Sequence, residues 1–142
     1  MVACTDKSPS GQIESMLTRI DKVENRVEKL YNQDFKELVD DYQDLDTTIA
    51  RTRDIHREMI LLQAYLQQFE YQVDIIYMNT EYSREQLSNL QYDIENQVYC
   101  DDTIAMFIRD EEKALREMEA QVKYFQEKFD AQKEVVKQLR KE

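Results

Sequence analysis

Few side chains in this sequence could do chemistry, and the first candidate is its only histidine. His56 stands alone among 142 residues, so a histidine ligand or a histidine base would have to be this one. Dimetal sites in helical bundles pair a histidine with a glutamate three residues earlier, whereas Arg53 holds that place here. The single glycine, Gly11, cannot build a Gly-rich phosphate loop. The sequence therefore predicts no catalytic residue, no metal ligand, no cofactor and no enzyme activity.

Carboxylates form the second candidate, because six of them gather in one run. Glu37, Asp41 and Asp44 share one face of a helix, where they could collect a divalent cation. Calcium sites normally take their ligands from a bent loop, which a straight helix does not provide. A solvated acidic face is therefore the favoured interpretation. The run comprises Asp34, Glu37, Asp40, Asp41, Asp44 and Asp46.

The two cysteines are the remaining reactive side chains. Cys100 precedes Asp101 and Asp102, whose negative charge disfavours a thiolate, so no nucleophilic role is expected. We expect a half-buried, small apolar side chain near a turn. A disulfide with Cys4 is not expected, since Cys4 stands in a short polar leader.

The residues that precede Cys4 suggest a different role for this cysteine. Met1, Val2 and Ala3 precede it, and small residues before a cysteine resemble the end of the lipobox of bacterial lipoproteins. In that family a signal peptide is cleaved before the cysteine, which is then lipidated. Met1 stands where leucine is usual, and the charged and apolar parts of a signal do not precede it. The resemblance implies a lipid anchor at Cys4 and a place in the bacterial cell envelope, in the periplasm or at the outer membrane. If Cys4 is a plain thiol, the expected location is the cytoplasm.

The overall charge limits the classes of partner that the chain can bind. The formal net charge is −11, so the surface repels nucleic-acid phosphates and anionic lipids. Basic residues gather near the end of the sequence, where positive charge interacts favourably with the dipole of a terminal helix. They are Lys133, Lys137, Arg140 and Lys141. We expect a protein partner or a second copy of the chain, no nucleic acid, and membrane contact only through Cys4.

The elements that carry these side chains are predicted to be helices. Sheet proteins need many tight turns, and the sequence has one glycine and one proline, both before residue 12. From residue 13 onward apolar residues recur three and four apart, which is typical of a coiled coil or helical bundle. We predict an all-α fold, an elongated antiparallel helical bundle of about three long helices. Residues 1–10 are expected to be a flexible leader and residues 11–142 a single domain.

The apolar stripe gives the expected core and its interruptions. Its phase slips between Tyr31 and Phe35, which indicates a kink, a short break or a bent helix. Turns are predicted at residues 46–48 and 100–102, where Asp and Thr favour helix starts. A turn at residues 79–80, giving a two-helix hairpin, and one unbroken rod are the alternatives. The stripe is Ile13, Leu17, Ile20, Val23, Val27, Leu30, Phe35, Leu38, Tyr42, Leu45, Ile49, Ile55, Met59, Leu62, Leu66, Phe69, Val73, Ile76, Leu87, Leu90, Ile94, Ile104, Ile108, Leu115, Met118, Val122, Phe125, Phe129, Val136 and Leu139.

Residues 59–78 are apolar off this stripe as well. A two-stranded coil would leave them in water, so they need neighbours on more than one side. Either this segment is the inner helix of the bundle, or it meets a partner. The interface candidates are Ile60, Leu61, Tyr65, Tyr71, Ile75 and Met78.

Two functions follow from this apolar segment. The first is a non-enzymatic interaction or scaffold protein, lipid-anchored in a bacterial envelope if Cys4 carries a lipid. The second is a holding chaperone or small-ligand carrier, whose helices splay so that residues 59–78 line a groove. A carrier should bind hydrophobic dyes while folded, and a scaffold should not.

Overall fold

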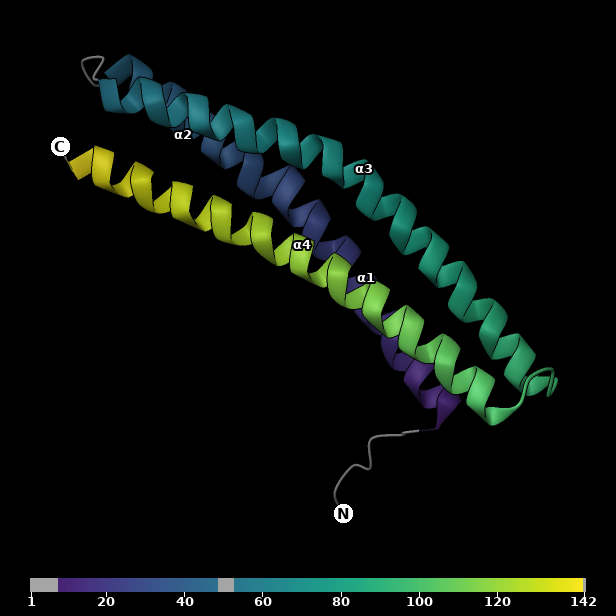
Figure 1. The fold of residues 1–142 in the computed structure, drawn as a ribbon. Coiled ribbons are helices and arrows are strands. Elements are labelled where there is room, and N and C mark those ends of the chain that lie inside the picture. Colours follow the sequence, from purple (N-terminus) through teal and green to yellow (C-terminus); the bar gives the residue numbers. More distant parts are fainter. Residues whose placement is uncertain (1–7, 49–52, 142) are drawn as a thin grey trace. The chain divides into compact units, whose positions relative to one another are not determined.

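The protein is all-α in the computed structural model, as the sequence predicts. The structure describes the backbone of residues 8–48 and 53–141, and the side chains of residues 8–45 and 56–141. Within these ranges there is no strand, and three long helical stretches pack against one another (Figure 1). The first stretch is continuous and comprises α1 (Pro9–Lys29), the π-helical turn η1 (Leu30–Asp34) and α2 (Phe35–Thr48). The others are α3 (Arg53–Glu95) and α4 (Asp101–Lys141).

Helix boundaries follow the capping residues. Ser8 caps α1, because its Oγ accepts a hydrogen bond from the Gly11 N–H at 3.1 Å, and Pro9 takes the first helical position. The predicted leader is therefore two residues too long, since Pro9 and Ser10 are helical. Cys4 lies outside the described residues, and so does Ile49 of the predicted stripe.

A turn is present near residue 100, but it lies earlier than the predicted residues 100–102, because α3 ends at Glu95 and Asp101 and Asp102 already belong to α4. Residues 46–48, where the other turn was predicted, are helical and belong to α2.

The turn after α3 begins with a helix C-cap. The Val98 N–H donates to the Asp93 carbonyl at 3.0 Å. The Gln97 N–H donates to the Ile94 carbonyl at 3.2 Å, which completes a Schellman motif. Gln97 consequently has a positive φ of 54°. The alternative turn at residues 79–80 is wrong, because both residues lie inside α3, and so is the unbroken rod.

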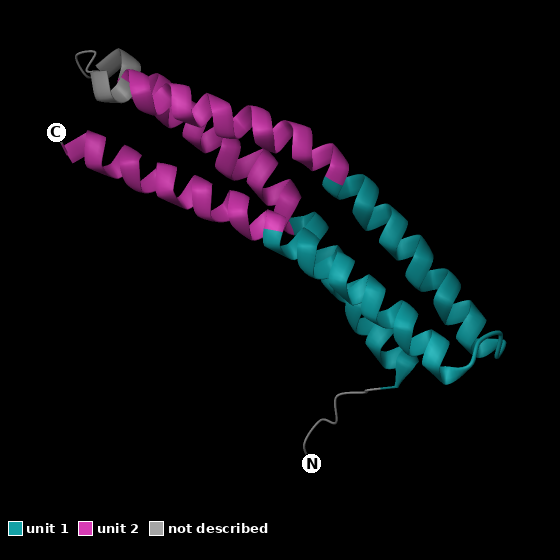
Figure 2. Cartoon of the chain, viewed as in Figure 1, with its two compact units in different colours: residues 1–25, 76–120 teal, residues 26–75, 121–142 magenta. Residues whose placement is uncertain are grey.

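The described chain divides into two compact units, and each takes a segment from all three helical stretches (Figure 2). Unit 1 comprises residues 1–25 and 76–120, and unit 2 comprises residues 26–75 and 121–142. Neither unit is a consecutive piece of sequence. The expectation of a single domain over residues 11–142 stays a prediction.

In unit 1, α1 is bound to both other helices by ion pairs. The Arg19 guanidinium contacts Glu112 and Glu119 of α4, at 2.6 and 2.5 Å. Arg84 of α3 donates to Asp21 at 2.7 Å and Glu24 at 2.9 Å. The same hydrogen bonds raise the pKa of Arg84 and lower the pKa of Glu24. The buried apolar side chains beneath are Ile13, Met16, Ile20, Val23, Ile76, Leu87, Leu90, Ile104, Ile108, Leu115 and Met118.

In unit 2, the core shows how the helices run. Phe69 of α3 packs on Phe125 and Phe129 of α4, with ring centroids 5.0 and 5.3 Å apart. Tyr65 lies one turn earlier on α3, and its ring also faces α4, 5.6 Å from the Lys128 Nζ. Helices α3 and α4 run antiparallel here (Figure 1). Conversely, Asp34 pairs with Lys133, and Asp41 with Arg140, so α2 and α4 are parallel.

The predicted phase slip has a physical cause, the π turn η1. A π turn inserts one residue into the helical ladder. The buried positions accordingly run 30, 34, 38, 42, 45 rather than in alternating steps of three and four. Two predicted core residues are corrected: Asp34 is buried in place of Phe35, and Met16 in place of Leu17. Met59 and Ile94 are also only partly buried.

Buried polar side chains in unit 2 are joined across helices. The Asp34 Oδ1 accepts from the Lys133 Nζ at 2.7 Å, which raises the pKa of Lys133. The Asp34 Oδ2 has no hydrogen-bond partner among the described residues. Tyr42 donates its hydroxyl to the Gln132 Oε1 at 2.7 Å, and burial, with the charge of Glu58, raises the pKa of Tyr42 to about 12.

Replacing Gln97 with glycine should stabilise the protein. A side chain at positive φ is disfavoured and glycine is not, so we expect Gln97→Gly to raise the free energy of unfolding by about 0.5–1 kcal/mol. Urea denaturation measures this. Asn96→Gly is the matched control and should bring no gain, because Asn96 has no positive φ and its side chain donates to the Tyr92 carbonyl. Equal effects of the two changes would refute the explanation.

The alkaline limit of stability should depend on Tyr42. An unfolded tyrosine ionises near pH 10, whereas folded Tyr42 holds its proton to about 12, so the folded state binds more protons in this window. Stability is therefore complete below pH 10 and falls by about 2 kcal/mol as pH rises to 12. Tyr42→Phe should flatten this fall in urea denaturation measured between pH 9 and 11.5. Tyr92→Phe, at an exposed position, should leave the fall unchanged.

Candidate functional site

Helix α3 carries a second stripe opposite its core positions. In unit 2 the core positions of α3 are Leu62, Leu66, Phe69 and Val73. Six other positions, spaced alternately three and four residues apart, are all exposed. We call these six the outer stripe: Arg57, Ile60, Ala64, Gln67, Tyr71 and Asp74.

The apolar members of this region are far more exposed than core residues. Ile60 is 54% exposed, Leu61 37% and Tyr71 69%. Ile75 is half-buried, and so is Tyr65, whose ring lies 5.6 Å from the Lys128 ammonium. In unit 1 the last interface candidate, Met78, is 69% exposed. The inner-helix interpretation of residues 59–78 is therefore wrong for the exposed candidates, which α1, η1, α2 and α4 do not cover.

Charge is missing from the middle of the outer stripe and present at its ends. Residues 60–69 contain no Asp, Glu, Lys, Arg or His, in a chain that is 35% charged. Arg57 precedes this stretch and Asp74 follows it. Among the described residues neither has an ion-pair partner.

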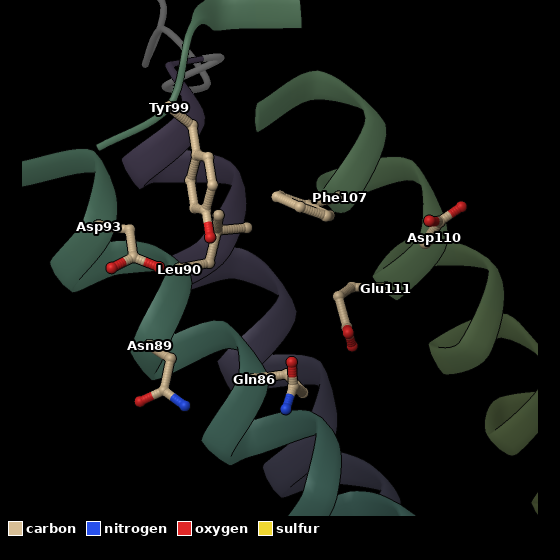
Figure 3. Close-up of a pocket in the computed structure, with 8 residues that line it drawn as sticks. All are labelled: Gln86, Asn89, Leu90, Asp93, Tyr99, Phe107, Asp110 and Glu111. Carbon is tan, nitrogen blue, oxygen red and sulfur yellow. The ribbon is translucent and has the colours of Figure 1, made fainter. Parts of the chain in front are cut away.

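A pocket in unit 1 lies near the α3–α4 turn (Figure 3). Its volume is about 180 Å³. Helix α3 contributes amide and carboxylate side chains on one side, and α4 contributes Phe107, Asp110 and Glu111 on the other. Tyr99 packs edge-on against Phe107 with ring centroids 5.3 Å apart. The lining residues are Gln86, Asn89, Leu90, Asp93, Tyr99, Phe107, Asp110 and Glu111.

Glu111 is the unusual side chain of this pocket. It occupies a core position of α4, between Ile108 and Leu115, yet it carries a carboxyl group. Burial raises the pKa of Glu111, and a hydrogen bond with the buried Ser83 hydroxyl partly opposes this rise. Glu111 is not among the predicted site residues, although the regular spacing of the α4 stripe passes through position 111. Carboxylates and rings together suit a cationic group better than an anionic one.

Cys100 differs from its prediction in both burial and electrostatics. It is exposed rather than half-buried, and its thiol is free. Its carbonyl accepts the first backbone bond of α4, from Ile104, so Cys100 itself is the N-cap in place of the predicted Asp101 or Asp102. Its sulfur lies 3.2 Å from the Thr103 hydroxyl. Hydrogen bonds from the Thr103 side chain and backbone lower the pKa of Cys100, outweighing the charge of Asp102.

The acidic run and the basic end of the chain are largely joined to each other. Arg140 lies 2.9 Å from Asp41 and 3.9 Å from Asp44, so a cation already neutralises two of the three carboxylates on the predicted face. Asp34 of the same run binds Lys133. The basic residues therefore do more than favour the helix dipole. The described part of the chain holds no group of three or more His, Cys, Asp or Glu side chains arranged to bind a metal.

His56 is exposed. None of the described helices combines the length and apolar character needed to cross a bilayer.

Comparison with known proteins finds no matching family model, and no similar curated protein or solved structure.

The thiol of Cys100 should owe its low pKa to Thr103. We expect Thr103→Val to raise this pKa and to slow alkylation by iodoacetamide at pH 7.5, because the thiolate is the reactive form. Thr103→Ser keeps the hydroxyl and is the matched control. Both variants are made with Cys4→Ser, so that a single thiol reacts. The same rate in both would show that the hydroxyl does not act on the sulfur.

Proposed function

We propose that this chain is a non-enzymatic interaction protein that docks a helix of a protein partner along the outer stripe of α3. The observation that carries the proposal is the exposure of Ile60 and Tyr71 on a helix whose opposite face already fills the core. Exposing such side chains costs solubility and contributes nothing to the fold, so a surface that retains them is typical of a binding site.

The spacing of the stripe determines the kind of partner. Positions three and four residues apart line up along one side of a helix, and a straight line of this kind with an uncharged middle packs best against another helix. Tyrosine adds a large contact area at a low cost in side-chain entropy. The expected partner is a helix with its own apolar stripe and with opposite charges facing Arg57 and Asp74.

The location and the anchor belong to the same proposal. A lipid on Cys4 would place the chain at a bacterial envelope membrane, with residues 5–8 as the link to α1. The net charge of −11 would keep the helices away from anionic lipid and from nucleic acid.

Photo-crosslinking in cells that make the protein tests the docking surface. A photoreactive residue at Ala64 should give a discrete crosslinked product with a protein, whereas one at the exposed Lys123 of α4 should not. Tyr71→Glu should abolish the product, because it places a charge in the apolar stripe. Tyr92→Glu, the same change at a 65% exposed site on the same helix, should not.

Two outcomes would contradict the proposal. One is the absence of any protein crosslink at Ala64. The other is hydrophobic dye binding by the folded chain that Tyr71→Glu abolishes, which would favour the carrier function instead. Unfolding does not confuse the result, because Tyr71 is 69% exposed and Tyr71→Glu should change the free energy of unfolding by only about 0.5 kcal/mol.

A further inference from the structure

The outer stripe of α3 has a symmetry of its own. Its six positions are arranged evenly about a midpoint between Tyr65 and Leu66. When two such stripes run in opposite directions about this midpoint, Arg57 comes opposite Asp74, Ile60 opposite Tyr71, and Ala64 opposite Gln67. All of these positions lie in unit 2, on one continuous helix. The surface can therefore meet a second copy of itself with every position matched.

The end charges select the direction of the pair. In the antiparallel arrangement each end joins the Arg57 cation of one copy to the Asp74 anion of the other, so two ion pairs form. A parallel arrangement would oppose Arg57 to Arg57 and Asp74 to Asp74, which is repulsive at both ends. Both side chains are exposed and have no ion-pair partner among the described residues, so they are available for this contact.

The middle of the stripe suits contact between like surfaces. Two copies of a chain with a net charge of −11 repel each other, but residues 60–69 carry no Asp, Glu, Lys, Arg or His. Ile60 and Tyr71 bring apolar area from both sides, and the small Ala64 allows the helix axes to approach. The amide of Gln67 is both donor and acceptor, so it can form a hydrogen bond with a glutamine amide of the second copy across a two-fold axis. The exposed Gln63 and Gln68 have the same property.

We propose that the helix docked on the outer stripe is α3 of a second copy, running antiparallel about the midpoint between Tyr65 and Leu66. This inference rests on the proposed docking function and names its partner. The pair is isologous, so the same stripe serves both copies.

Sedimentation equilibrium on the full chain tests the pair and its direction. The wild-type protein should show twice the 17.1 kDa mass of one chain. Arg57→Glu and Asp74→Arg should each weaken the association by about ten-fold, because each turns two attractive contacts into repulsive ones. Combining the two changes restores opposite charges and should restore the wild-type affinity. Glu70→Arg is the control, an exposed charge reversal on the same helix outside the stripe.

Three results of this sedimentation experiment would overturn the inference. The first is a monomeric wild-type chain at all concentrations up to about 1 mM. The second is a dimer that neither single charge reversal weakens. The third is a double variant no tighter than the single ones, since a parallel pair gives no such rescue. If the crosslink at Ala64 joins a different protein, the docking function stands and the self-pairing falls.

Discussion

A bundle of three helices can cover only one stripe of each helix, and the other features of this protein depend on that limit. Helices α1 and α4 comply with this limit, because their large apolar residues lie mainly on the covered face. Helix α3 does not, since Ile60 and Tyr71 lie opposite its core positions. Burying a side chain of this kind is worth about 1.5–3 kcal/mol. This free energy is not used by the fold of one chain and is available for association.

The polar side chains within the core decide how the helices align. An apolar stripe alone permits neighbouring helices to slide by a heptad at little cost, because leucine and isoleucine positions look alike. Asp34 with Lys133, and Tyr42 with Gln132, remove this freedom in unit 2, since a slip would leave buried polar groups without partners. In unit 1 the contact of Ser83 with Glu111 acts in the same way. The cost of burying these groups is thus offset by a defined register.

The sequence predicted the helices and the α3–α4 turn because both depend on local rules. A regular spacing of three and four residues defines a face, and Asp101 and Asp102 favour a helix start. It could not predict which residue enters the core at the π turn. The apolar spacing shows that the helix gains an extra residue there, but it fits more than one position for that residue. It missed the Arg19 and Arg84 ion pairs, since periodicity gives the phase of a helix but not its neighbours. The predicted direction of the Cys100 pKa was wrong. The charges of the neighbouring Asp101 and Asp102 are visible in the sequence, whereas the hydrogen bonds at the start of α4 are not.

The outer stripe also contains features that limit what can bind to it. An exposed apolar line without charged ends would accept many partners in many registers and would promote aggregation. Arg57 and Asp74 mark the ends with opposite signs, so in the proposed pair a partner shifted by one heptad would lose its ion pairs and would place a charge against apolar surface. Ala64 leaves room at the middle that a larger side chain would fill. The high negative charge elsewhere repels acidic proteins, including other faces of this one. In the proposed docking function, selectivity would therefore come from the surroundings of the stripe as much as from the stripe itself.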